Sequence, residues 1–155
     1  MKAQIANPFI TSAVKVFRKE IGVELTRKSL TKKTSPMPSL HISIIIGVTG
    51  PVRGQVVYSM DQSFAESVSK AMLPGKLPAE VRKMTHSAVS ELANMITGMA
   101  SIDLAGEDKL ISITPPTVFT GPALRIDFLN LPTVSLNFLS QFGTMEVNIA
   151  LADAG

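Results

Sequence analysis

Apolar residues near the start of the chain recur at the spacing of an amphipathic helix. Asn7 followed by Pro8 is typical of a helix cap and a first-turn proline, and Gly22 predicts the end of the helix. The apolar positions between them are Phe9, Ala13, Val16, Phe17 and Ile21. The pattern therefore predicts a first helix that buries one face.

The segments that follow this helix predict strands, and the second of them is rich in β-branched residues. The predicted strands are residues 23–31, 40–48 and 52–60, with the loop SPMPS at residues 35–39 between the first two. Gly47, Gly50 and Gly54 are interpreted as turn glycines that join the last two strands into a hairpin. Asp61 is then the predicted cap of a short helix that ends near Leu73.

The longest helical pattern covers residues 79 to about 105, and the chain after it has β character. We expect a bend at Pro115 and Pro116 and a hairpin turn at Gly143. The predicted strands of this part are residues 109–113, 123–129, 133–138 and 145–151.

Alternating apolar positions in the last part of the chain fit a sheet that buries one face under helices. These positions are Leu124, Ile126 and Phe128 in one segment and Val134, Leu136 and Phe138 in the next. The order of elements is helix, strands, two helices, strands. We therefore expect one α+β domain over residues 1–155, with a largely antiparallel sheet and helices packed on one face.

Projection of residues 79–105 at about 100° per residue separates two faces of the long helix. The stripe interpreted as core is Met84, Ala88, Leu92, Met95, Met99 and Ile102. The other face carries Ser87, Glu91, Asn94, Gly98 and Ser101. Small residues around one carboxylate allow another molecule's backbone to come close. Gly98 costs roughly 1 kcal/mol against Ala in a helix interior, which favours a packing or access reason for it.

Composition limits the chemistry that this chain can perform. The absence of Cys excludes a disulfide, a thiolate metal site and a cysteine nucleophile. His41 and His86 are the only histidines, so a multi-histidine metal site is not expected. The sequence also lacks the short motifs of serine hydrolases, zinc peptidases and P-loop proteins.

The net charge of +3 does not indicate nucleic-acid binding. The one basic cluster, Arg27, Lys28, Lys32 and Lys33, has no aromatic residue for base stacking and is interpreted as a solvated strand or loop. The start MKAQIANPF is too short and polar for a signal peptide. The apolar run at residues 42–48 is far below the roughly 20 residues of a membrane span. We expect a cytoplasmic protein with neither nucleic acid nor a membrane as partner.

The long helix resembles the CheC/CheX/FliY family of chemotaxis phosphatases. That family's motif is Asp or Ser, three residues, Glu, two residues, Asn, and a proline about twenty-two residues later. Here Ser87, Glu91 and Asn94 fill the first positions within and just before SELANMITG, and Pro116 lies at or within one position of the proline.

The resemblance is closest to CheX and covers nearly the whole chain. The segments NPFITSAVKVFRKEIG, IIIGVTGPVRGQVVYSM and ITPPTVFTG follow one another in the family's order. CheC-type proteins carry two Glu-Asn motifs, whereas the first helix here has no Glu-x-x-Asn. One site per chain is therefore expected, as in CheX.

This resemblance implies a phosphatase that hydrolyses the aspartyl phosphate of a CheY-like response regulator. Asn94 would position the attacking water, and Glu91 would pair with the receiver's active-site lysine. Ser87, Gly98 and Ser101 would contact the partner. No cofactor of its own is implied, because Mg²⁺ would arrive bound to the receiver. The resemblance also implies a homodimer formed through the sheets.

Two other functions remain open from the residues alone. The charged fraction of 17% and the eight Met leave apolar surface for a module that binds a receiver or a flagellar-switch component without catalysis. A ligand-binding α+β domain is the third possibility, and it would show a deep apolar pocket away from residues 87–101.

Overall fold

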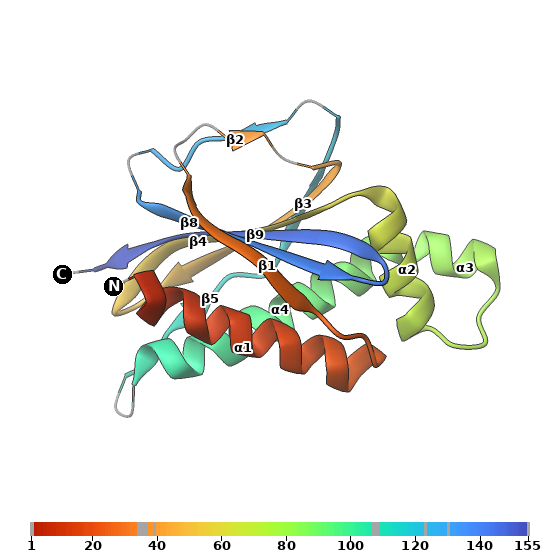
Figure 1. Cartoon of the computed structure of the whole chain (residues 1–155), viewed down its shortest axis with the longest axis horizontal. Helices are drawn as coiled ribbons and strands as arrows, with labels where there is room; N and C mark the ends of the chain where they lie inside the picture. Colours follow the sequence, from red (N-terminus) through yellow and green to blue (C-terminus); the bar gives the residue numbers. More distant parts are fainter. Residues whose placement is uncertain are drawn as a thin grey trace.

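Backbone hydrogen bonds join most of the strands into one antiparallel sheet, and helices cross one of its faces (Figure 1). The computed structural model describes residues 2–33, 37–38, 40–106, 109–122, 124–129 and 131–154. The helices are α1 Lys2–Ile21, α2 Gln62–Met72, α3 Pro78–Lys83 and α4 Thr85–Ala105. The strands are β1 Thr26–Lys33, β2 Met37–Pro38, β3 Ile42–Thr49, β4 Val52–Met60, β5 Ser112–Ile113, β6 Thr117–Thr120, β7 Arg125–Ile126, β8 Thr133–Ser140 and β9 Gly143–Asp153.

The strands of the large sheet follow the order β1-β8-β9-β4-β3-β5, and β6 also pairs with β3. Strands β3 and β4 form the predicted hairpin, and so do β8 and β9, where Ser140 lies opposite Gly143. Strands β5 and β6 share the outer side of β3, with Val48 opposite Ile113 and Ile45 opposite Thr117. The predicted antiparallel sheet is confirmed.

The main core fills the space between the sheet and helices α1, α2 and α4. Val134, Leu136 and Phe138 on β8 contribute to it, as their alternation predicts. Its largest fully buried side chains are Tyr58, Phe9, Phe17, Phe64, Phe138, Ile42, Ile44, Ile46, Ile96, Leu136, Met145 and Ile149. Each such side chain stabilises the fold by about 1.5–3 kcal/mol relative to an exposed position. The α+β class with helices on one face is therefore confirmed.

A smaller apolar cluster lies on the opposite face of the sheet. Phe128 packs there with Val57 and Ala150, and Ile126 lies against them. The prediction that Ile126 and Phe128 face the helices is therefore wrong. The chain leaves the main sheet here and pairs β7 with β2, which lies above the sheet on the side away from α1 (Figure 1). Strand β7 is only two residues long, against a predicted strand at 123–129 in which residue 123 lies outside the described residues.

Helix α1 begins earlier than the predicted cap at Asn7, and Pro8 lies inside it. Ala6 and Phe9 are both buried, so packing favours the longer helix. Pro8 cannot donate to the carbonyl of Gln4, but Gln4 is exposed and water can replace that bond. The predicted end is confirmed, because Gly22 has a φ of 66° and its N–H bonds to the carbonyl of Arg18 at 3.1 Å.

Strand β1 begins at Thr26 rather than at Val23, although Val23 is buried. It is an outer strand of the sheet, and the exposed Arg27 and Lys28 confirm the interpretation of a solvated strand for these two cations. The side chains of Lys32 and Lys33 lie outside the described part. In the predicted loop at 35–39, residues 37 and 38 form β2, while 35, 36 and 39 are outside the described residues.

The predicted long helix is two helices that meet at Met84. Met84 has φ −94° and ψ 4°, and Pro78 starts the first of the two helices. Val81 is buried, and its carbonyl accepts one hydrogen bond from Ser69 of α2 and one from Thr85 of α4, which fix the short helix against both. No helix in the described part of the chain is long and apolar enough to span a membrane.

Two of the three predicted turn glycines belong to strands. Gly47 lies in β3 and Gly54 in β4, and only Gly50 is in the turn between them. Gly54 has a φ of 144°, and a Cβ there would collide with the carbonyl of Ala150 on β9. Glycine is therefore required at this position for the close approach of the two strands.

Candidate active site

Helix α4 presents Ser87, Glu91 and Asn94 to solvent, as the sequence predicts. Glu91 and Asn94 are three residues apart, which places their Cβ atoms about 5–6 Å from each other on one face. Neither side chain has a hydrogen bond or ion pair with another described residue. A carboxylate and an amide therefore stand side by side with all of their bonding capacity available to another molecule.

The opposite face of α4 is buried and, apart from Leu92, carries small or β-branched residues. The buried positions are Thr85, Ala88, Val89, Leu92, Ala93, Ile96, Thr97, Ala100, Ser101 and Ala105. Small side chains let the helix lie close to the sheet and to α1, which crosses beside it in Figure 1. The sequence places Ser101 on the open face with Glu91, but Ser101 is only 9% exposed, and its hydroxyl donates to the carbonyl of Gly98 at 2.7 Å.

The apolar stripe predicted as core is only partly buried. Ala88 and Leu92 are buried and Met95 packs against the core, but Met84, Met99 and Ile102 are 43%, 38% and 73% exposed. The stripe prediction is therefore wrong for these last three residues. They lie on the solvent side because the alanines of α4, rather than its methionines, pack against the sheet.

A buried hydrogen-bond chain fixes the rotation of α4 on the sheet. The hydroxyls of Tyr58 on β4 and Thr97 on α4 are 2.8 Å apart, and Thr97 donates to the carbonyl of Ala93 at 2.8 Å. Thr97 has one hydroxyl hydrogen, so Tyr58 must be the donor between them. Burial raises the pKa of Tyr58, an effect that the bond to Thr97 opposes. The anchor lies one turn from Asn94 and holds that side chain outward.

The motif's distant proline segment is held beside α4 by strand β3. The N–H of Gly47 donates to Oγ1 of Thr114 at 2.8 Å, and the N–H of Thr114 donates to the carbonyl of Gly47 at 2.9 Å. Pro115 and Pro116 follow directly, between β5 and β6, and both of these strands contact α4. A Cβ on Gly98 would lie 4.0 Å from Ile113 on β5. Residues far apart in the sequence thus border one face of α4.

Sequence reasoning did not identify Tyr58, Thr97 or the Gly47–Thr114 pair. Their partners are 39 and 67 residues apart, so no local spacing reveals them. Thr97 also lies outside the stripe that the sequence predicts as core, so its buried hydroxyl could not be anticipated.

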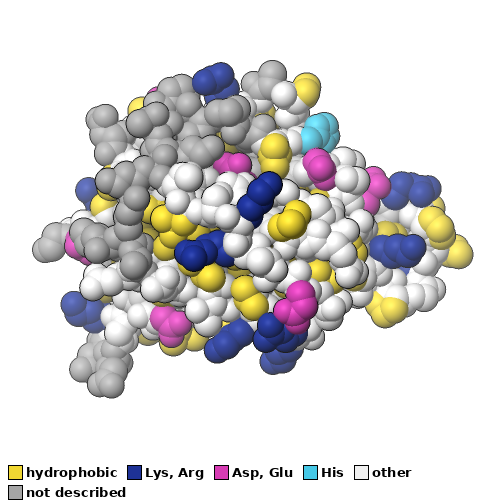
Figure 2. Space-filling view, in the orientation of Figure 1, with side chains coloured by type: hydrophobic (Ala, Val, Ile, Leu, Met, Phe, Trp, Pro, Cys, Tyr) yellow, Lys and Arg dark blue, Asp and Glu magenta, His cyan; other side chains and the backbone are white. Residues whose placement is uncertain are grey.

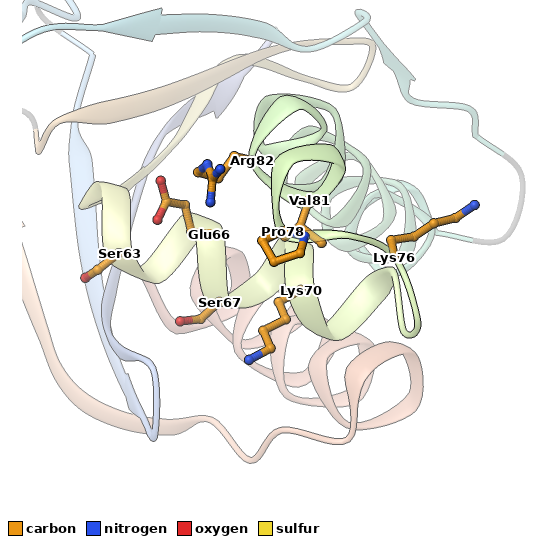
Figure 3. Close-up of a pocket in the computed structure, with 8 residues that line it drawn as sticks. All are labelled: Ser63, Glu66, Ser67, Lys70, Lys76, Pro78, Val81 and Arg82. Atoms are coloured by element: carbon orange, nitrogen blue, oxygen red, sulfur yellow. The ribbon is translucent and has the colours of Figure 1, made fainter.

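A second hollow on the described surface lies away from Glu91 and Asn94. The hollow between α2 and α3 holds about 380 Å³ and is lined mainly by Ser63, Glu66, Ser67, Lys70, Lys76, Pro78, Val81 and Arg82. Figure 3 shows Glu66 and Arg82 turned toward each other, while Lys70 and Lys76 point in different directions. The described residues contain no group of three or more acidic or histidine side chains suited to a metal ion.

The third possibility, a ligand-binding domain, required a deep apolar pocket. Among the described residues, the apolar space between the sheet and α4 holds about 10 Å³, beside Tyr58 and Phe64. That volume admits no more than one water molecule. The larger hollows, including one of about 300 Å³ beside Glu91 and Met84, are open grooves on the helical surface.

The family described as chemotaxis phosphatase CheX matches residues 42–139, which include Glu91 and Asn94. A CheY-P phosphatase CheX from Thermotoga maritima is 33% identical over 132 residues, which cover 81% of this chain and 81% of that protein.

Solved structures share the fold over nearly the whole chain. The chemotaxis protein CheX from Desulfovibrio desulfuricans has a TM-score of 0.84 at 25% identity, and the match covers 96% of this chain and 98% of that one. A CheX in complex with CheY, BeF₃ and Mg²⁺ from Borrelia burgdorferi has a TM-score of 0.77 at 24% identity, covering 96% and 97%.

Proposed function

Because this chain belongs to the CheX family of chemotaxis phosphatases, we propose that it hydrolyses the aspartyl phosphate of a CheY-like response regulator. The observation that carries this proposal is the exposed pair Glu91 and Asn94 on α4. Both side chains lack partners within the described structure, and both fall inside the segment that matches the family. The relative from Thermotoga maritima is a CheY-P phosphatase, which supports the same activity here.

The proposed reaction is the hydrolysis of an acyl phosphate. Water attacks phosphorus as the bond between phosphorus and the aspartyl oxygen breaks, and the products are the free carboxylate and inorganic phosphate. Such a transfer has a loose transition state, so catalysis is mainly placement and electrostatics. The phosphatase therefore needs groups that position water and no nucleophile of its own.

Asn94 is the proposed water-positioning residue. Its amide oxygen accepts a hydrogen bond from the attacking water, and its amide nitrogen donates one to a phosphoryl oxygen. The amide is uncharged, so it does not repel the phosphoryl group as a carboxylate would. The outward rotation set by Thr97 lets this short side chain reach into the active site of a partner.

Glu91 is the proposed docking residue. Its carboxylate pairs with the active-site lysine of the receiver and so holds Asn94 in register with the phosphorus. Ser87 and Gly98 flank the pair and allow the partner's backbone to approach. Ser101 offers little surface for that purpose, since it is 9% exposed and bonded to Gly98.

The divalent cation of the reaction is proposed to belong to the partner. The Borrelia burgdorferi complex contains Mg²⁺ and BeF₃ together with CheX and CheY, which supports this assignment. Carboxylates that bind Mg²⁺ would lie in the receiver's active site. A phosphorylated receiver is an intracellular protein, so we propose that this chain works in the cytoplasm.

We also propose that the chain forms a homodimer through its sheet. The outer strands are β1 on one side and β5 with β6 on the other. Backbone groups on an outer strand can pair with a second copy. Sedimentation of the purified chain as a monomer at micromolar concentration would contradict this proposal.

The activity is tested by adding the chain to a phosphorylated CheY-like receiver and following the loss of phosphate. Wild type is expected to exceed the receiver's own rate, and Asn94→Ala is expected to lose about 100-fold in rate through misplaced water. Glu91→Ala is expected to lose rate as well, mainly through weaker docking. Asp103→Ala, an exposed substitution on the same helix, is the matched control. Equal rates for wild type and both site variants would refute the proposal.

Exposed apolar residues favour one alternative, a module that binds a receiver or flagellar-switch component without catalysis. Met84, Met99 and Ile102 leave apolar surface beside the Glu91–Asn94 pair. Calorimetry that detects binding of the receiver, with no dephosphorylation above the receiver's own rate, would support this alternative over hydrolysis.

A further inference from the structure

A groove runs between α1 and α4 beside the candidate active site. Its volume is about 670 Å³. The α4 side is apolar, and the α1 side carries charged residues along its rim. The lining residues are Lys15, Val16, Arg18, Lys19, Glu20, Met95, Gly98, Met99 and Ile102.

The apolar wall continues the face of α4 that carries Glu91. Met95, Met99 and Ile102 follow Glu91 at intervals of four, four and three residues, so they lie in line with it along the helix. Ile102 is 73% exposed, an unusual position for a large aliphatic side chain in a helix with a well-packed opposite face. Met99 is exposed as well, whereas Met95 is partly buried against the core. Exposed apolar side chains next to a candidate active site are typical of a docking surface.

The length of this line suits a whole domain as occupant. Ile102 lies eleven residues after Glu91, or roughly 16 Å along the helix axis at 1.5 Å per residue. A small domain is about 30 Å across. A receiver seated with its phosphorylated aspartate over Asn94 therefore extends past Ile102 on one side.

The charged side chains at the rim of the groove give it a net positive charge. Arg18 is held by Glu24 through two hydrogen bonds of 2.7 and 2.8 Å. Lys15 and Lys19 are exposed one turn apart on α1, and neither has an ion pair within the described part of the chain. Figure 2 shows Lys and Arg side chains along the lower edge of the molecule, over α1. Glu20 is the one carboxylate in the lining.

The chemistry of the proposed substrate complements this rim. A receiver's active site combines a phosphorylated aspartate with the carboxylates that bind Mg²⁺, so its surface is acidic around the reacting group. Free cations on α1 attract such a surface and steer its approach.

We propose that the α1–α4 groove is the docking surface for one flank of the receiver domain, with Ile102 as its apolar anchor and Lys15 and Lys19 as its electrostatic rim. This inference rests on the proposed function and assigns the receiver to one side of the Glu91–Asn94 pair. Ile102, Lys15 and Lys19 are positioning residues, because they bind the partner away from the reacting atoms.

The test separates docking from chemistry by measuring KM and kcat for dephosphorylation over a range of receiver concentrations. Ile102→Ser is expected to raise KM about tenfold, the effect of leaving one aliphatic side chain out of an interface, with kcat unchanged. The matched control is Leu77→Ser, since Leu77 is 67% exposed and outside the groove lining. The control is expected to leave KM and kcat unchanged.

Reversal of the rim charges gives an independent readout. The double variant Lys15→Glu/Lys19→Glu is expected to lower kcat/KM about tenfold at low salt and to weaken its salt dependence. Unchanged KM in Ile102→Ser together with unchanged salt dependence in the double variant would overturn the proposal. A change of wild-type dimer to monomer caused by Ile102→Ser alone would overturn it too, because a second copy would then occupy the groove.

Failure of the proposed function is distinguishable from failure of this inference. If wild type does not accelerate dephosphorylation, the proposed function fails, and calorimetry with a receiver loaded with Mg²⁺ and beryllium fluoride still tests the groove. A Kd about tenfold weaker for Ile102→Ser than for Leu77→Ser supports the groove in that case. Equal Kd values overturn it.

Discussion

The hydroxyl of Tyr58 donates a 2.8 Å hydrogen bond to the hydroxyl of Thr97 in the main core, and this bond joins the sheet to the helix that carries the proposed catalytic residues. Tyr58 is fully buried, and Thr97 lies three residues after Asn94. A rotation of α4 about its own axis would move Asn94 out of its exposed position. The pair therefore couples the stability of the fold to the geometry of the active site.

Thr97→Val is expected to lower the free energy of unfolding by about 1–3 kcal/mol. Valine has nearly the shape of threonine but leaves the buried Tyr58 hydroxyl without an acceptor. Urea denaturation monitored by circular dichroism measures the loss. Tyr58→Phe is the control, and its expected cost of about 1 kcal/mol is smaller because Thr97 keeps its bond to Ala93. A greater loss in Tyr58→Phe than in Thr97→Val would contradict this account.

Alkaline pH is expected to destabilise the fold through Tyr58. Burial raises the pKa of its hydroxyl in the folded chain above the ordinary value of about 10. Tyr58 therefore ionises more easily in the unfolded chain than in the folded one. The free energy of unfolding does not depend on this group below pH 10, and it falls as the pH rises above 10, by up to about 1.4 kcal/mol per pH unit. Tyr58 is the only tyrosine, so the ultraviolet absorbance of tyrosinate should rise only as the chain unfolds.

The comparison with Tyr58→Phe isolates this contribution from other titrating groups. Above pH 10 the difference in unfolding free energy between wild type and Tyr58→Phe should shrink. Ionisation of Tyr58 near pH 10 with the far-ultraviolet spectrum intact would show that the hydroxyl is not buried as described.

Gly98→Ala is expected to stabilise the chain by roughly 0.5–1 kcal/mol, because alanine favours the helix and its Cβ meets Ile113 at an ordinary distance of 4.0 Å. The same methyl group should lower kcat/KM, since Gly98 lies in the surface that the partner is proposed to approach. Thermal unfolding and dephosphorylation rates measure the two effects. Asp103→Ala on the same helix should raise stability without the loss of activity, and equal activity of Gly98→Ala and wild type would exclude a role for Gly98 in access.

The antiparallel sheet was predictable because each of its long strands has a recognisable pattern within its own sequence. β-Branched residues and alternating apolar positions define β3, β4, β8 and β9, and Gly143 marks a hairpin. The two-residue strands β5 and β7 are much shorter than the strands predicted at 109–113 and 123–129, and, like β2, they exist through pairing with distant segments. β6 was not predicted, because it too forms by pairing with distant residues, on the outer side of β3.

The exposure of the candidate site was predictable from the sequence, whereas the set of α4 residues that packs against the sheet was not. Ser87, Glu91 and Asn94 are polar or small at helical spacing, so their common face follows from the sequence. Met99 and Ile102 are as apolar as core residues, and only the packing of Ala93 and Ala100 against the core shows that they face outward. Side-chain type predicts burial poorly where alanine forms the contact surface of a helix.

The central claim is that Asn94 places the attacking water, and a single-turnover experiment tests it most directly. The chain in excess over a phosphorylated CheY-like receiver, at a concentration that saturates it, removes docking from the measured rate. Asn94→Ala is expected to reduce that rate about 100-fold, toward the receiver's own rate, while the Kd for the beryllium-fluoride-loaded receiver stays within about twofold of wild type. A single-turnover rate for Asn94→Ala equal to that of wild type would contradict the account.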